Sequence, residues 1–493
     1  MKHSLKVKTA RFVIGGLLFS LMALSLIGWK VRAGSSAPSA IITVNSTADG
    51  APANNGQCTL REAIINANFN TQSGSTDCAA GNGADTISFS LPAGPQTINL
   101  TSELPDITAS LTITGPGANN LTVQRGTGGE YGIFSFPGTN HANTVSGLTI
   151  RNGLTPGSGG GIYSAGALTL IDCVITDNHA QVGGGVQLVF GSGTFTNCAI
   201  SNNTADLQGG GINYQGSTGH ALTLTNCTIS GNTANGFGSG GGILNLSGPN
   251  TTSTMEVVNC TIANNISSTS NGGGIRTSGG PGSPTTTVLR NTIIANNTLP
   301  NLTITSTATV DSQGYNLASD GGGGFLTQPT DQINKDPLLA PLGNYGGSSP
   351  TQALLPGSPA INAGTNTGAP ATDQRGIARV GVTDIGAFES RGFNLTASGG
   401  NNQTALPGAA FSSPLTVTVS SSFSEPIVGG QVAFLPPVGG ASALLAPNPA
   451  AIAANNRASV SATANNQAGS YQVTATTGGN SVAFALTNFS CPS

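Results

Sequence analysis

A run of three glycines occurs five times in the middle of the chain, and its spacing limits the possible folds more than any other feature. A β-branched residue follows each run, at spacings of 24, 26, 31 and 32 residues: Ile162, Val186, Ile212, Ile243 and Ile275. Short alternating segments such as Ala167-Leu168-Thr169-Leu170 lie between the runs, with turn residues such as Asp177-Asn178 and no helical stretch. Units of this length with several short strands are typical of a parallel β-helix, for which we expect three strands per coil.

Residues that repeat in step with the glycines should stack in files, because successive coils lie about 4.8 Å apart. The first predicted file contains Cys173, Cys198, Cys227 and Cys260, continued by Asn291. The second contains Ile175, Ile200, Ile229, Ile262 and Ile293, and the third contains Asn178, Asn203, Asn232, Asn265 and Asn296. We interpret the cysteines as small buried side chains, with metal binding or disulfides between coils as alternatives. The asparagines should stabilise turns and hydrogen-bond along their file, with a metal or sugar site as the alternative. No zinc-type ligand spacing is present, so the sequence predicts no metal and no cofactor.

Residues 1–33 have the three parts of a secretory signal peptide: a basic start, an apolar run over 12–29 and a small-x-small site at Val31-Arg32-Ala33. The run is long enough for an uncleaved membrane anchor as the alternative. Six of the 16 basic residues and none of the 19 acidic residues lie in this segment, so the remainder carries a net charge of −9. This charge argues against nucleic-acid partners, and membrane contact is expected only through the N-terminal segment if it is uncleaved. We expect a secreted or cell-surface location, where Cys58 and Cys78 could form a disulfide.

A short helix is predicted directly after Cys58. Thr59 and Glu62 have the spacing of a capping box, and Leu60, Ala63 and Ile64 give an apolar helical face. Such a helix would cover the exposed first coil of a solenoid. Residues 58–63 read CTLREA and resemble the CSLREA motif of exported bacterial β-helix proteins, with threonine where that family has serine.

Residues 335–390 resemble the choice-of-anchor Q domain, on the segments Gly357-Ser358-Pro359, Asp373-Gln374-Arg375-Gly376 and 384–389 (DIGAFE). The glycine repeats are similar to the right-handed β-helix class shared with pectate lyases and polymorphic outer-membrane proteins. The resemblance covers residues 41–390 and implies a β-helix with a cap at 41–80, glycine repeats at 145–300 and the anchor-like segment at 335–390. It implies no catalytic residues.

Residues 393–489 have a different pattern. Segments 415–419, 458–464, 471–475 and 482–486 alternate with a period of two and are separated by Pro, Gly and Asn. This pattern predicts an antiparallel β-sandwich and resembles the immunoglobulin-like modules of bacterial surface proteins. The predicted fold class is therefore all-β: a right-handed parallel β-helix followed by an Ig-like sandwich.

A β-helix hydrolase would need carboxylates paired on neighbouring coils. The position of Asp172 is taken by Asn197, Asn226 and Asn259 in later repeats, and that of Asp177 by Asn202, Gly231 and Asn264. We therefore predict no catalytic residue. Tyr163 and Tyr214 are candidates for a ligand-binding face, with an ordinary mixed surface as the alternative. The predicted function is non-catalytic: adhesion, display or binding of an extracellular glycan or surface protein. The alternative is a polysaccharide lyase or glycoside hydrolase.

Overall fold

The computed structural model describes residues 39–490 except 270, 299 and 306. The predicted signal peptide, residues 1–33, and Cys491 lie outside the described residues. The described part begins with β1 (Ile41–Val44) and α1 (Leu60–Phe69). The capping box is confirmed: the Thr59 hydroxyl accepts the backbone N–H of Glu62, and a Glu62 carboxylate oxygen accepts the N–H of Thr59 at 2.9 Å. The buried face of α1 packs on β1, and a disulfide joins Cys58 to Cys78 as expected.

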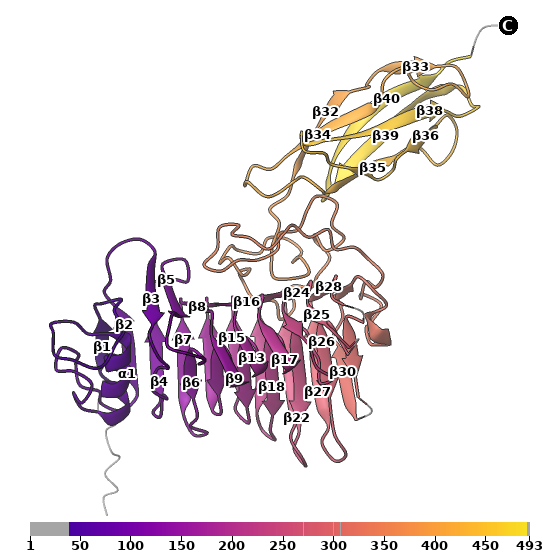
Figure 1. Ribbon diagram of the computed structural model, residues 1–493. Helices are drawn as coiled ribbons and strands as arrows, with labels where there is room; N and C mark the ends of the chain where they lie inside the picture. The colour runs from indigo at the N-terminus through magenta and orange to yellow at the C-terminus, as the bar shows by residue number, and fades with distance from the viewer. Residues whose placement is uncertain (1–38, 270, 299, 306, 491–493) are drawn as a thin grey trace, which may run out of the picture. The chain divides into compact units, whose positions relative to one another are not determined.

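Four parallel sheets form the solenoid, and Figure 1 shows their strands stacked coil on coil. Sheet A contains β1, β2 (Asp85–Phe89), β4 (Leu111–Thr114), β7 (Ala142–Ser146), β11 (Ala167–Ile171), β15 (Gly193–Thr196), β19 (Ala221–Thr225), β23 (Ser253–Val258), β27 (Thr285–Arg290) and β30 (Ala308–Ser312). Sheet B contains β3 (Gln96–Leu100), β5 (Leu121–Arg125), β8 (Thr149–Arg151), β12 (Val174–Thr176), β16 (Ala199–Ser201), β20 (Thr228–Ser230), β24 (Thr261–Ala263), β28 (Ile293–Ala295) and β31 (Leu317–Ala318).

The other two sheets are shorter. Sheet C contains β9 (Leu154–Ser158), β13 (His179–Val182), β17 (Thr204–Gln208), β21 (Thr233–Ala234) and β25 (Ile266–Ser267). Sheet D contains β6 (Phe134–Phe136), β10 (Ile162–Ser164), β14 (Val186–Val189), β18 (Ile212–Gly216), β22 (Ile243–Ser247), β26 (Ile275–Ser278) and β29 (Leu302–Ile304). A central coil thus has four strands, and the prediction of three was wrong. Sheet C is the strand set that the sequence did not reveal, because its strands have no apolar alternation.

The corners between sheets require a left-handed backbone. The corner from sheet A to sheet B has φ between 50° and 55° at Asp172, Asn197, Asn226, Asn259 and Asn291. The corner from sheet B to sheet C has φ between 55° and 70° at Asp177, Asn202, Gly231, Asn264 and Asn296. Asn, Asp and Gly adopt this conformation most readily. The exchange of Asp for Asn or Gly at these positions is therefore explained by the turn itself.

The predicted cysteine and isoleucine files are confirmed over four coils. Cys173, Cys198, Cys227 and Cys260 are free thiols inside the solenoid. Ile175 pairs in register with Ile200, and the file continues through Ile229 to Ile262. Burial raises the pKa of the thiols of Cys198 and Cys260.

The last member of each predicted file is wrong by one residue. Ile262 pairs with Ile294, and Thr261 pairs with Ile293. Ile293 therefore points out of the solenoid, since neighbouring strand residues face opposite sides. By the same shift, Thr292 and not Asn291 stacks next to Cys260 in the cysteine file. Asn291 occupies the corner between sheets A and B.

The asparagine file forms a continuous ladder inside the corner between sheets B and C. The side-chain Nδ2 of Asn178, Asn203 and Asn232 each donates to Oδ1 of the next asparagine at 2.9 Å. Asn265 donates in the same way to Asn297, so the predicted member Asn296 is wrong. Asn296 is exposed at the left-handed corner, whereas Asn297 is buried. Each ladder residue also donates to a carbonyl of the preceding coil, as Asn203 does to Ile175 at 2.9 Å.

After β31 a 3₁₀ turn, η1 (Gly322–Gly324), leads into residues 335–390, which form an irregular segment that we call the strap.

The C-terminal part is an antiparallel sandwich with its own hydrophobic core. Its first sheet contains β32 (Asn394–Gly399), β34 (Leu415–Ser420), β38 (Arg457–Ala464) and β36 (Ala443–Ala446). Its second sheet contains β33 (Gln403–Ala405), β40 (Asn480–Asn488), β39 (Gly469–Thr477), β35 (Gln431–Leu435) and β37 (Ala450–Ala451). Within this second sheet β33 pairs with β40 in parallel.

Candidate functional site

The two tyrosines predicted for a ligand face lie on opposite sides of sheet D. Tyr163 is half-buried on the outer side, in register with Gln187. Tyr214 is 0% exposed, and burial raises its pKa to about 12. The prediction for Tyr214 was wrong because position 214 is the third residue of β18, which alternates inward again after the outward Asn213. No ligand face is formed by this pair.

The strap covers the outer face of sheet B. The Ser349 hydroxyl donates to the Asn197 carbonyl at 2.7 Å, and the Thr228 hydroxyl donates to the side-chain oxygen of Gln374 at 2.6 Å. Farther along, Ile293 and Ala295 of β28 belong to a hydrophobic cluster with strap residues. The outward side chains of sheet B that the strap covers are thus unavailable for a ligand.

Buried ion pairs hold the strap in its conformation. Arg375 and Asp373 are 2.7 Å apart with side chains 1% and 0% exposed, and the Arg375 guanidinium lies 3.6 Å from the ring centre of Phe388. Arg379 and Glu389 form a second pair at 3.0 Å. Backbone groups supply further hydrogen bonds to these carboxylates: Asp373 also accepts the N–H of Glu389 at 3.0 Å. Removing either partner of such a pair would leave an uncompensated buried charge.

Asp384 has the most perturbed carboxyl group of the strap. Burial, followed by the charge of the neighbouring Glu389, raises its pKa to about 8. Its two oxygens each accept a backbone N–H at 2.6 Å, one from Asn362 and one from Ser390. Asp384 is 1% exposed, and sequence reasoning did not single it out because its burial depends on where the strap is placed. Asp384 belongs to the DIGAFE segment at residues 384–389, but the sequence does not indicate that its side chain is buried.

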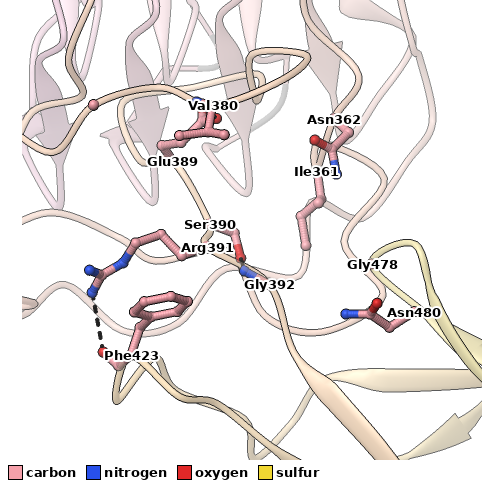
Figure 2. Close-up of a pocket in the computed structure, with 11 residues that line it drawn as sticks. Ile361, Asn362, Val380, Glu389, Ser390, Arg391, Gly392, Phe423, Gly478 and Asn480 are labelled. Carbon is pink, nitrogen blue, oxygen red and sulfur yellow. Dashed lines mark hydrogen bonds between the residues drawn. The ribbon is translucent and has the colours of Figure 1, made fainter.

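A pocket of about 370 Å³ lies next to this group, where the strap meets loops of the sandwich (Figure 2). Apolar side chains Ile361, Val380 and Phe423 line it, together with the polar Arg391 and Asn480. Arg391 lies 4.1 Å from the ring centre of Phe423 and is 3.8 Å from Glu425. Burial raises the pKa of Glu425, whose carboxylate accepts the Ser390 hydroxyl at 2.8 Å and the N–H of Arg391 at 2.9 Å. Of the charged residues that line the pocket, Arg391 contacts Phe423 and Glu425 of the sandwich, and Glu389 is paired with Arg379 inside the strap.

Of the two acids weighed for catalysis, Asp172 accepts the Ser348 hydroxyl of the strap at 3.0 Å, and Asp177 lies in a surface ion pair, as does a third acid of the repeats, Asp206. Asp177 is 3.4 Å from Arg151, and Asp206 is 2.8 Å from the Nε2 of His179. Both pairs are substantially exposed, so each is an ordinary surface contact. Among the described residues, no group of three or more His, Cys, Asp and Glu side chains could hold a metal ion.

Comparison with known proteins addresses the fold. Between residues 39 and 490, apart from the three gaps, no helix is long and apolar enough to cross a membrane. No curated protein matches the sequence. A family model described as a right handed beta helix region matches residues 118–314, the part of the chain that contains most of the stacked coils. The solenoid of this chain is therefore a right-handed parallel β-helix.

Proposed function

We propose that this is a non-catalytic secreted or cell-surface protein that serves in adhesion or display, with an extracellular glycan or a surface protein as its partner. One observation carries the proposal. The carboxylates that converge in the strap, those of Asp373, Asp384 and Glu389, are occupied by arginines and backbone N–H groups that fix the strap. Their arrangement serves to hold the strap in its conformation.

The sequence resemblances support the same assignment. CTLREA at residues 58–63, the choice-of-anchor Q likeness of the strap and the Ig-like pattern of the sandwich are features of exported bacterial proteins. The segment over residues 1–33 would direct export and, if uncleaved, would be the only membrane contact.

The alternative function is polysaccharide cleavage, and one observation favours it. Burial and the charge of Glu389 raise the pKa of Asp384 to about 8, and its carboxyl oxygens accept the backbone N–H groups of Asn362 and Ser390, two residues that line the pocket. Against this, both Asp384 oxygens are within 2.6 Å of backbone nitrogens, and its side chain is not among those lining the pocket.

The two functions separate in one experiment. The purified full chain is applied to an array of plant and bacterial polysaccharides and to isolated cell envelopes, and soluble products are analysed in parallel. Retention on a surface with no release of new chain ends is the expected result. Release of reducing or unsaturated ends that is lost in Asp384→Asn, but not in Asp206→Asn, would establish the enzyme instead.

A further inference from the structure

A second groove lies on the solenoid itself, beside the outer face of sheet A. It has a volume of about 340 Å³. Its floor contains Thr223 and Thr225 of β19, Glu256 of β23 and Arg290 of β27, and its wall is the strap loop at Gly368–Pro370. None of these residues takes part in the ion pairs that fix the strap.

The wall of this groove is held at both ends by corner asparagines. Asn291 and Thr365 exchange two hydrogen bonds, at 2.8 and 2.9 Å, and Asn226 donates to the Thr372 carbonyl at 2.8 Å. Arg290 donates to the Gly368 carbonyl at 3.1 Å. A wall fixed in this way lowers the ordering cost of binding.

Two polar groups of the floor are available. Among the described residues, neither the Glu256 carboxylate nor the Thr223 hydroxyl makes a hydrogen bond or an ion pair, whereas Arg290 already donates to the Gly368 carbonyl and its Nε is buried. Glu256 offers acceptors and Arg290 offers donors, and the two charges balance.

A file of hydroxyl groups leads out of the groove along the solenoid. Thr223 is in register with Thr194, Thr194 with Thr169, and the file continues through Thr144 and Thr112. These side chains point outward and repeat about every 4.8 Å. The threonine file carries no charge, which disfavours both anionic and cationic polymers.

An extended peptide is a poorer fit than a carbohydrate. The strands of sheet A at the groove are paired on both sides, so no free edge is available for β-augmentation. The floor has one buried apolar side chain, Val258, and no pocket for an apolar anchor.

We propose that this groove binds a neutral, extended polysaccharide, with the chain lying along the threonine file and one sugar between Glu256 and Arg290. The proposal rests on the proposed function and names its binding site and ligand class. Ligand hydroxyls donate to the Glu256 carboxylate and accept from Arg290, and the threonines bind the sugars that follow.

The test is calorimetric titration of the full chain with three hexasaccharides: cellohexaose, mannohexaose and hexagalacturonic acid. At least one of the two neutral probes should bind with a dissociation constant below about 1 mM, and the anionic probe should not. Glu256→Gln should weaken that binding about tenfold, because the acceptor loses its charge and a hydrogen bond to a charged group is stronger than one to a neutral amide. Asp311→Asn removes an acid from the same outer face beyond the groove and should change the affinity less than twofold.

A second variant guards against misfolding. Thr194→Lys changes an exposed position, keeps the floor acid and should also weaken binding by placing a charge and a long side chain in the file. Failure of both neutral probes, or unchanged binding in Glu256→Gln and Thr194→Lys, would overturn the proposal. Adhesion of the full chain to cell envelopes that is unaffected by these variants would leave the proposed function standing while the groove assignment fails.

Discussion

The adjacent residues Asn296 and Asn297 provide a decisive test of the coil register. Asn297 has its side chain in the ladder: Nδ2 donates to the Ile262 carbonyl and to Asn301 Oδ1, both at 2.9 Å. Its Oδ1 accepts the backbone N–H and the Nδ2 of Asn265, again both at 2.9 Å. Asn297→Ala therefore removes four buried hydrogen bonds. At about 1 kcal/mol each, the variant should lose about 3–5 kcal/mol of local stability.

Asn296→Gly is the matched control. Asn296 is exposed and has φ of 55°, a conformation that glycine adopts without strain, so this variant should lose little. Hydrogen exchange measured by mass spectrometry over residues 259–275 reports the difference at the neighbouring coil. Protection should fall roughly 100-fold or more in Asn297→Ala and stay nearly unchanged in Asn296→Gly. Equal losses in the two variants would refute the register and the ladder that follows from it.

Three further predictions concern other parts of the molecule. Gly210→Ala should prevent stable coil formation, because a Cβ there would overlap the carbonyl oxygens of Gly241 and Thr233. The control Gly219→Ala places its Cβ in open space and should cost only the strain of its left-handed backbone. Circular dichroism and melting temperature compare the two variants. Removing the disulfide by replacing both its cysteines with alanine opens a 20-residue separation and should destabilise the N-terminal cap by roughly 3 kcal/mol, seen as faster exchange in α1 without loss of the sandwich. The folded-state pKa of Asp384, about 8, is raised above the ordinary value of 3.8, so the native state binds a proton that the unfolded state releases. The free energy of unfolding should therefore decline as pH rises from about 4 to 8. Asp384→Asn should flatten this part of the plot of stability against pH, and an unchanged slope would contradict the assignment.

The repeat pattern predicted the solenoid because each coil depends on local spacing. Ile175 and Ile200 are separated by one period, and their stacking follows from the sequence alone. The last repeat was misaligned because residues 291–293 read Asn-Thr-Ile, which imitates the Cys-Thr-Ile of residues 260–262 although the true equivalent begins one residue later. A shift of one residue reverses the facing of every side chain, which is why Ile293 was assigned inside and lies outside.

The placement of the strap could not be predicted from the sequence. Its contacts join residues far apart in the chain, such as Thr228 with Gln374, and it has neither strand alternation nor helical period. The elevated pKa of Asp384 depends on that placement, since burial is its largest cause. For the same reason the groove at Glu256 and Arg290 could not be predicted, because its wall belongs to the strap.

The length of the strap also limits the number of coils in the part of the solenoid that it spans. It bonds to the corner asparagines of successive coils, to Asn226 through Thr372, to Asn259 through Asp384 and to Asn291 through Thr365. Duplication of a coil inside this span would move the later corners away by about 4.8 Å while the strap kept its length. Coils N-terminal to the contact between Asn119 and Gly347 could multiply without this conflict. We therefore expect natural or designed variation in coil number to occur on that side of the strap, or to be accompanied by a strap lengthened in step.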